Sequence, residues 1–140
     1  MRDIKFRAWN KKHNEMWEVT SMSWVIPRSY NEPERDTSDT VQSIGAGNKD
    51  STNELHPDNT LIQYTGLKDK NGVEIYEGDI FKSSNEVGSI QGVVKFQDGA
   101  FVATHAYLEV SPNLGDIKSM TSVEVIGNVH ENPELLKENK

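Results

Sequence analysis

Three carboxylate side chains crowd one short segment of the sequence. Glu74, Glu77 and Asp79 lie within the six residues EIYEGD. Such a cluster could bind a divalent cation through its oxygen atoms, or supply a general acid and a general base. The alternative is structural, since Asp79 could accept backbone N–H groups of a turn at Gly78 while Glu77 faces water. We favour the structural interpretation, because acids beside a glycine turn are common and no EF-hand spacing or nearby histidine supports a metal.

The segment KDKNG, Lys68–Gly72, comes just before this cluster. Asn-Gly is a strong signal for a tight turn, and it places the charges of Lys68, Asp69 and Lys70 at the rim. These charges could bind a phosphate group or a partner's carboxylate. We favour a solvated hairpin tip, because exposed turns select these residue types for backbone reasons.

Other patterns typical of catalysis or metal binding are missing from the sequence. The four histidines, His13, His56, His105 and His130, show no metal-ligand spacing. The chain has no cysteine, which excludes thiolate metal sites, disulfides and cysteine nucleophiles. It contains neither a G-x-S-x-G elbow nor a phosphate-binding P-loop. We therefore expect no catalytic residue, no metal and no cofactor.

Aromatic and basic side chains share the first 24 residues. Trp9, Trp17 and Trp24 occur there with Phe6. Five basic residues fall within positions 1–13, namely Arg2, Lys5, Arg7, Lys11 and Lys12. Together they could form a surface on which single-stranded nucleic acid stacks. The alternative is an aromatic core, which we favour because small domains gain burial from large aromatic side chains.

The overall charge argues against broad binding to nucleic acid. The 140 residues include 15 Lys and Arg against 22 Asp and Glu, for a net charge of −7. Binding along a phosphate backbone depends on clustered Lys and Arg. No apolar run approaches the ~20 residues of a membrane-spanning helix, so we expect no membrane association. Charged and apolar residues alternate in MRDIKFRAWN, which is unlike a signal peptide and predicts no export by that route.

The N-terminal part predicts a β-hairpin region over residues 1–26. Apolar and polar residues alternate over 3–9, and an apolar run resumes at 16–19, as in a two-stranded hairpin. Residues 22–26 predict a third short strand, which Pro27 ends.

A polar segment follows over residues 27–60. Its few apolar residues are scattered, and a structureless loop of this length is unusual inside a compact domain. We interpret it as a flexible insertion or linker, in which Val41 and Ile44 could anchor a short helix.

Residues 61–140 predict a small, bent β-barrel. About five short strands are separated by glycine turns such as Asn71-Gly72 and Asp98-Gly99. A one-turn helix follows, with Asn132 as N-cap and Pro133 at the first helical position. The fold class expected for the whole chain is mostly β, with α+β character.

Three stretches together resemble a known family. They are IKFRAWN (4–10), YTGLKDKNGVEIYEGDI (64–80) and VIGNVHENPELL (125–136). The combination resembles the YopX family of phage and prophage proteins. The resemblance implies an SH3-like barrel in the C-terminal part and a cytoplasmic location in a bacterial host cell. It supplies no catalytic residue.

Three functions remain compatible with these observations. We favour a non-enzymatic protein-protein interaction module that binds an unknown host or phage protein, or a second copy of itself as a homo-oligomer. The second is a nucleic-acid-binding accessory protein that uses the basic, aromatic N-terminal strand, which the net charge disfavours. The third is a metal-dependent enzyme built on the EIYEGD acids.

A contact surface, if the chain has one, is expected on the N-terminal strand and the two central turns. The apolar N-terminal hairpin must also pack on the barrel or on another chain, because an isolated hairpin is marginally stable. The candidate surface residues are Arg7, Trp9, Lys68, Asp69, Lys70, Asn71, Glu74, Tyr76, Glu77 and Asp79.

Overall fold

The structure, a computed structural model, describes residues 2–24, 42–47, 54–55, 60–105 and 112–137. The chain is mostly β, as the sequence predicts. It divides into two compact units. One is Phe6–Leu61, called here the inserted unit, and the other, called the half-barrel unit, combines Met1–Lys5 with Ile62–Lys140. The chain therefore leaves the half-barrel unit after Lys5 and returns to it at Ile62.

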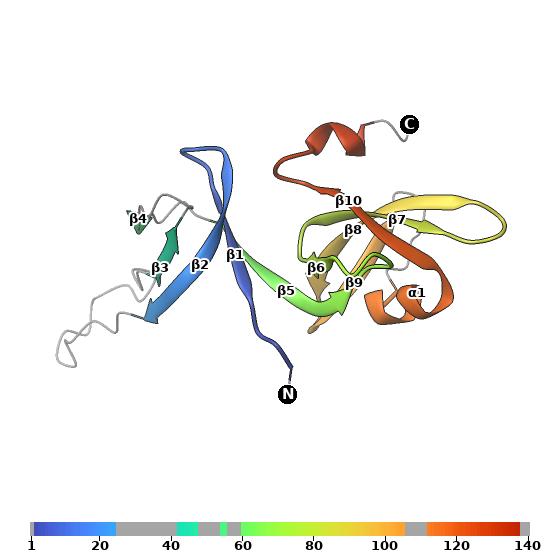
Figure 1. Ribbon diagram of the computed structural model, residues 1–140, viewed down its shortest axis with the longest axis horizontal. Coiled ribbons are helices and arrows are strands. Elements are labelled where there is room, and N and C mark those ends of the chain that lie inside the picture. Colours follow the sequence, from blue (N-terminus) through green and yellow to red (C-terminus); the bar gives the residue numbers. More distant parts are fainter. Residues whose placement is uncertain (1, 25–41, 48–53, 56–59, 106–111, 138–140) are drawn as a thin grey trace. The chain divides into compact units, whose positions relative to one another are not determined.

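The inserted unit is built from antiparallel strands that follow the order β4-β3-β2-β1 (Figure 1). The bounds are β1 (Phe6–Asn10), β2 (Glu15–Trp24), β3 (Gln42–Gly47) and β4 (Glu54–Leu55). In the β1–β2 hairpin Ala8 lies opposite Trp17, and both are buried with Val19 packed against them.

Two expectations for this part of the chain are wrong. Residues 22–24 continue β2 instead of starting a third strand, because β3 extends the pairing as far as Trp24, opposite Gln42. Ile44 lies in β3 opposite Met22, so it belongs to a strand and not to a short helix. Pairing with β2 outweighs the low strand preference of a glycine-rich segment. Val41 and residues 25–26 lie outside the described residues, as does most of the expected linker 27–60, whose described parts include β3 and β4.

The half-barrel unit contains a four-stranded antiparallel sheet of order β10-β7-β8-β9, and β5 pairs antiparallel with β6 (Figure 1). A short helix and a 3₁₀ helix complete it. The bounds are β5 (Thr60–Lys68), β6 (Glu74–Tyr76), β7 (Asp79–Ser84), β8 (Ser89–Gln97), β9 (Ala100–His105), α1 (Leu114–Met120), β10 (Ser122–Asn128) and the 3₁₀ helix η2 (Pro133–Leu136).

The Asp98-Gly99 turn confirms the hairpin predicted there. Gln97 pairs with Ala100, so two residues join β8 to β9. Both turn residues have positive φ, 51° for Asp98 and 80° for Gly99. This is the conformation that an Asp-Gly pair adopts readily in a tight hairpin.

The core of the half-barrel unit lies between α1 and one face of the sheet. Its buried members come from six elements, one from each: Ile75, Phe81, Val94, Ala103, Leu114 and Val123. The sequence analysis did not predict α1, since the segment LGDIKSM is short and contains glycine, and its N-cap Asn113 makes no side-chain capping bond. Burial of Leu114 against the sheet stabilises this helix instead.

The C-terminal 3₁₀ helix confirms the predicted one-turn helix, with Pro133 in its first turn. Asn132 occupies the N-cap position, as predicted, but its side chain makes no capping hydrogen bond. Its Oδ1 instead accepts the backbone N–H of Asn128 at 3.3 Å, next to a glycine whose added Cβ would lie 2.6 Å from that oxygen. Asn132 thus holds the end of β10 against the helix at Gly127. None of the helices in the described ranges is long and apolar enough to span a bilayer.

Candidate functional site

The KDKNG turn is held by its buried aspartate. Asp69 is 6% exposed, and its Oδ1 accepts the backbone N–H groups of Asn71 at 2.8 Å and Val73 at 2.9 Å. Its Oδ2 accepts the N–H of Val125 in β10 at 3.0 Å, and the N–H of Lys70 donates to the Val123 carbonyl at 2.9 Å. Because β10 is an edge strand of the four-stranded sheet, this turn serves as its outer hydrogen-bonding neighbour.

These contacts also set the charge of Asp69. Burial raises the pKa of its carboxyl group, but the N–H groups of Val125, Val73 and Asn71 and the nearby Lys70 ammonium outweigh burial. The pKa of Asp69 therefore lies below its ordinary value of 3.8. Asp69 is an ionised structural residue at neutral pH.

The charges on the rim of this turn pair with β10. The Lys70 ammonium lies 3.0 Å from a Glu124 carboxylate oxygen, and the Asn71 side-chain amide donates to the other oxygen at 3.4 Å. Lys68, the last residue of β5, is exposed.

The acids of EIYEGD also contact the chain itself. The Glu74 carboxylate forms a salt bridge with Lys5 and accepts the Tyr76 hydroxyl at 3.0 Å. The hydrogen bond to Glu74 raises the pKa of the Lys5 ammonium above 10.5, and the ammonium lies 5.4 Å from the centre of the Tyr64 ring. This cluster joins the N-terminal segment to β5 and β6.

Asp79 makes the turn hydrogen bond expected of it. Its Oδ2 accepts the backbone N–H of Tyr76 at 2.8 Å, and Asp79 is buried. Gly78 has a φ of 82°, and its N–H donates to Val94 while its carbonyl accepts the N–H of Val129. Glu77 is half-buried in this turn. The EGD turn thereby links β8 to the segment after β10.

Two predicted surface residues, Arg7 and Trp9, belong to β1 of the inserted unit. Trp9 is 6% exposed and Trp17 is 2% exposed, which agrees with the aromatic core that we favoured. Arg7 is half-buried and lies opposite Glu18 in the hairpin register. The other eight predicted residues lie in the half-barrel unit, along β5, β6 and their turns.

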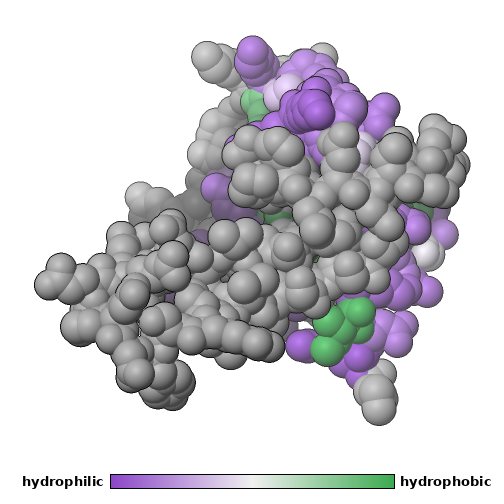
Figure 2. Space-filling model, turned by 90° about the vertical axis from the view of Figure 1, so that its left-hand side faces the viewer, coloured by the Kyte–Doolittle hydropathy of each residue, from purple (hydrophilic) through white to green (hydrophobic). Residues whose placement is uncertain are grey.

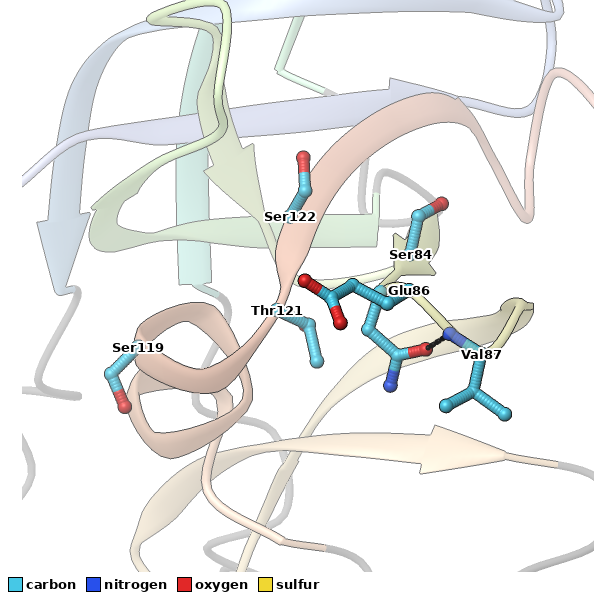
Figure 3. A pocket seen from close by; sticks show the side chains of 7 residues that line it. Ser84, Glu86, Val87, Ser119, Thr121 and Ser122 are labelled. Carbon is cyan, nitrogen blue, oxygen red and sulfur yellow. Dashed lines mark hydrogen bonds between the residues drawn. The ribbon is translucent and has the colours of Figure 1, made fainter.

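A pocket that the sequence analysis did not identify lies at the β7–β8 hairpin of the half-barrel unit (Figure 3). It is open to solvent and has a volume of about 560 Å³. One side is formed by the hairpin turn and the other by the junction of α1 with β10. The lining residues are Ser84, Asn85, Glu86 and Val87 on the first side, and Ser119, Thr121 and Ser122 on the second.

The hairpin tip beside this pocket is ordered by Asn85. The Asn85 Oδ1 accepts the backbone N–H groups of Val87 at 2.9 Å and Gly88 at 3.1 Å, and the Asn85 N–H donates to the Gly88 carbonyl at 2.9 Å. Val87 at the tip is 96% exposed. The tip therefore presents an apolar side chain on a backbone that is already fixed.

The opposite side of the pocket is fixed by hydroxyl groups. Thr121 donates to the Ile117 carbonyl at 2.9 Å and lies 2.6 Å from the Ser83 hydroxyl, so Ser83 is the donor of that pair. Ser122 lies opposite Ser84 in the β10–β7 register. Residues far apart in the sequence thus meet at one pocket.

The only sequence signal for this site is the turn SSNEVG, which puts a valine among polar residues. Among the described residues, no three His, Asp or Glu side chains gather to hold a metal.

Comparisons with known proteins identify the family. The model of the YopX protein family matches residues 5–137. The crystal structure of protein EF1440 from Enterococcus faecalis is similar at 29% identity over 97% of this chain and 99% of that chain, with a TM-score of 0.57. The X-ray structure of yopX from Bacillus subtilis shares the fold at 21% identity over 97% of both chains, with a TM-score of 0.59. No curated protein matches the chain. Because the family match spans nearly the whole sequence, the chain belongs to the YopX protein family.

Proposed function

We propose that the chain is a non-enzymatic protein-binding module of a phage or prophage, which acts in the bacterial cytoplasm and binds its partner at the β7–β8 hairpin tip. The exposure of Val87 carries this proposal. Because Asn85 has already ordered the turn, a partner can bury this valine at little cost in conformational entropy.

The surroundings of Val87 fit an interface of ordinary composition. Protein interfaces combine an apolar centre with a polar rim, and here hydroxyl, amide and carboxylate groups lie next to the valine. Val87 is the one large apolar side chain among the residues that line the pocket, so it offers a single anchor and not a broad apolar patch. Figure 2 shows another face of the molecule, on which the described residues are mostly hydrophilic and the hydrophobic ones form small, separate groups.

The contacts of the EIYEGD acids fit the structural role that we favoured for them, and they support a binding role for the chain over chemistry. Glu74 is bound to Lys5 and Tyr76, and Asp79 holds the Tyr76 backbone. The burial of Trp9 and Trp17 likewise removes two of the aromatic rings on which a nucleic-acid surface would depend.

The test compares two valines in a capture experiment. The tagged chain, its Val87→Ser variant and its Val73→Ser variant are incubated with an Enterococcus faecalis lysate, with and without nuclease. Val73 is the matched control, since it is also exposed and lies in a turn of the same unit. We expect a protein that the wild type and Val73→Ser capture stoichiometrically, and that Val87→Ser loses.

Each other outcome identifies a different function. Equal capture by all three proteins places the contact away from the hairpin tip. Loss of capture after nuclease treatment supports the nucleic-acid-binding alternative. Capture of the same chain, with dimers in light scattering at tens of micromolar, assigns the tip to self-association.

A further inference from the structure

The hairpin-tip pocket contains an acid without a counter-ion. No basic side chain of the described residues pairs with Glu86, and the other lining residues are neutral. Figure 3 shows the Glu86 side chain extending from the hairpin across the pocket, towards Thr121. Residues 61–140 as a whole carry more acids than bases, so the surrounding field also favours a positive ligand.

The hydrogen-bonding groups left over in the pocket are largely acceptors. The Thr121 hydroxyl already donates one hydrogen bond, to the Ile117 carbonyl, and accepts another from Ser83. The Ser119 hydroxyl donates to the Asp116 carbonyl. The Asn85 oxygen already accepts two backbone N–H groups, while the Asn85 amide nitrogen and the hydroxyls of Ser84 and Ser122 keep donors of their own. The carboxylate of Glu86 and the lone pairs of the serine hydroxyls remain for a ligand that is rich in donors.

We propose that this pocket binds an arginine side chain of the partner protein, an inference that rests on the function proposed above. The guanidinium group carries five N–H donors in a planar fork that matches a carboxylate. One edge of the fork binds Glu86, and its remaining donors reach the hydroxyls of Ser84 and Ser122. The aliphatic stem packs on Val87, which otherwise faces water.

Arginine fits this arrangement better than lysine. The acceptors are spread over both sides of the pocket, on β7 with its hairpin turn and on the start of β10. A planar group with donors in several directions can reach both sides at once, whereas an ammonium group is a compact point charge with a stronger hydration shell. The order imposed by Asn85 keeps Glu86 and Val87 next to each other before the ligand arrives.

The test uses small arginine analogues and the full chain. N-acetyl-arginine amide is titrated into the ¹⁵N-labelled protein, and amide shifts are followed by NMR. N-acetyl-citrulline amide, which has the same shape without the charge, and N-acetyl-lysine amide serve as matched probes. Glu86→Gln removes the proposed counter-ion, and Glu134→Gln, at an exposed acid on the 3₁₀ helix, is the control variant.

We expect the arginine probe to shift the amides of residues 84–88 and 119–122. A ligand of this size binds with a dissociation constant of about 1 mM at ordinary ligand efficiency. We expect at least about tenfold weaker binding by the citrulline probe and by Glu86→Gln, since both lose the charge-assisted bond. Binding to Glu134→Gln stays unchanged, and the spectra show whether each variant is folded.

Three results would overturn the inference. They are equal binding of the arginine and citrulline probes, equal binding of the lysine probe, and shifts that occur only outside the two pocket segments. The function itself is judged separately, because Val87→Ser can abolish capture of a protein even where the arginine probe fails. In that case the partner protein contacts Val87, but the pocket does not bind an arginine side chain.

Discussion

Asp69 is the residue on which the KDKNG turn depends. One carboxylate accepts N–H groups from its own turn and from β10, so it connects two parts of the unit that are more than fifty residues apart in sequence. The sequence indicated a charged turn at this position. It could not indicate that the charge is buried, because burial comes from docking of the turn on β10.

Replacing Asp69 by Asn removes one acceptor and adds a donor. The new amide group faces either Val125 or the turn, so at least one N–H loses its partner. We expect the free energy of unfolding to fall by about 1–3 kcal/mol, the usual cost of an unsatisfied buried group. Urea titration measures it. Asp98→Asn is the control, because Asp98 lies in an exposed turn where Asn is tolerated. An equal loss of unfolding free energy in the two variants would contradict the role of Asp69.

The same residue makes stability depend on pH. Because the folded-state pKa of Asp69 lies below its ordinary value of 3.8, its contribution is present above that value and is lost as pH falls through the folded-state pKa. We expect the free energy of unfolding to decrease between about pH 5 and pH 2, and to decrease less in Asp69→Asn. Urea titrations of both proteins across this range test it, and parallel pH curves would exclude Asp69 as the source.

At the scale of elements, the close approach of β7, β8 and β9 depends on Gly92. Phe81, Gly92 and His105 lie in register across the three strands, and the rings of Phe81 and His105 meet edge to face at 5.4 Å. A Cβ atom on Gly92 would lie 2.5 Å from the Thr104 carbonyl oxygen and 2.7 Å from the Phe81 ring. The glycine is therefore required by packing and not by its φ angle.

The Gly92→Ala substitution places a methyl group against a backbone carbonyl of β9. A backbone atom cannot rotate away as a side chain can, so β8 and β9 have to move apart. We expect a loss of about 1–3 kcal/mol in the free energy of unfolding, as for other overpacked cores. Gly115→Ala in α1 is the control with the opposite sign, because an added Cβ there meets open space. It should gain about 0.4–1 kcal/mol by restricting the unfolded chain. Thermal and urea unfolding of both variants measure the difference, and a Gly92→Ala protein of wild-type stability would refute the packing argument.

Elements with strong local signals could be predicted from the sequence, and elements stabilised by distant contacts could not. The Asp98-Gly99 hairpin and the 3₁₀ helix after Asn132 have such signals. β3 and α1 do not, because both contain glycine and depend on neighbours, β2 for the strand and Leu114 packing for the helix. The hairpin-tip pocket escaped prediction for the same reason, since the β7–β10 register alone brings Ser84 to Ser122.

At the scale of the whole molecule, the chain makes one unit from two separated segments. Lys5 and Ile62 are the points of exit and return, and the Lys5 carbonyl accepts the N–H of Tyr64 at 2.9 Å. Lys5 and Ile62 therefore lie close together. They are the two residues that a linker would join if residues 6–61 were removed. The half-barrel unit also has its own core and its own pocket.

We expect the half-barrel unit to fold after residues 6–61 are replaced by about four flexible residues, which span the short gap. Dispersed NMR amide shifts and a single cooperative urea transition are the measurements. The arginine probe should still shift residues 84–88, since the pocket lies in the retained part. A molten or unfolded product would show that the inserted unit is needed for the fold.

The exit at Lys5 and return at Ile62 also order events during protein synthesis. Residues 1–5 are made before the inserted unit, yet their hydrogen-bonding partner at Tyr64 follows it. The inserted unit can thus begin to fold on the ribosome while the half-barrel unit still lacks most of its strands. At about 5–20 residues per second, the stretch from Phe6 to Tyr64 takes roughly 3–12 s to appear. During that interval the N-terminal segment has no strand of its own unit to join, so a nascent-chain binding factor would meet it in extended form.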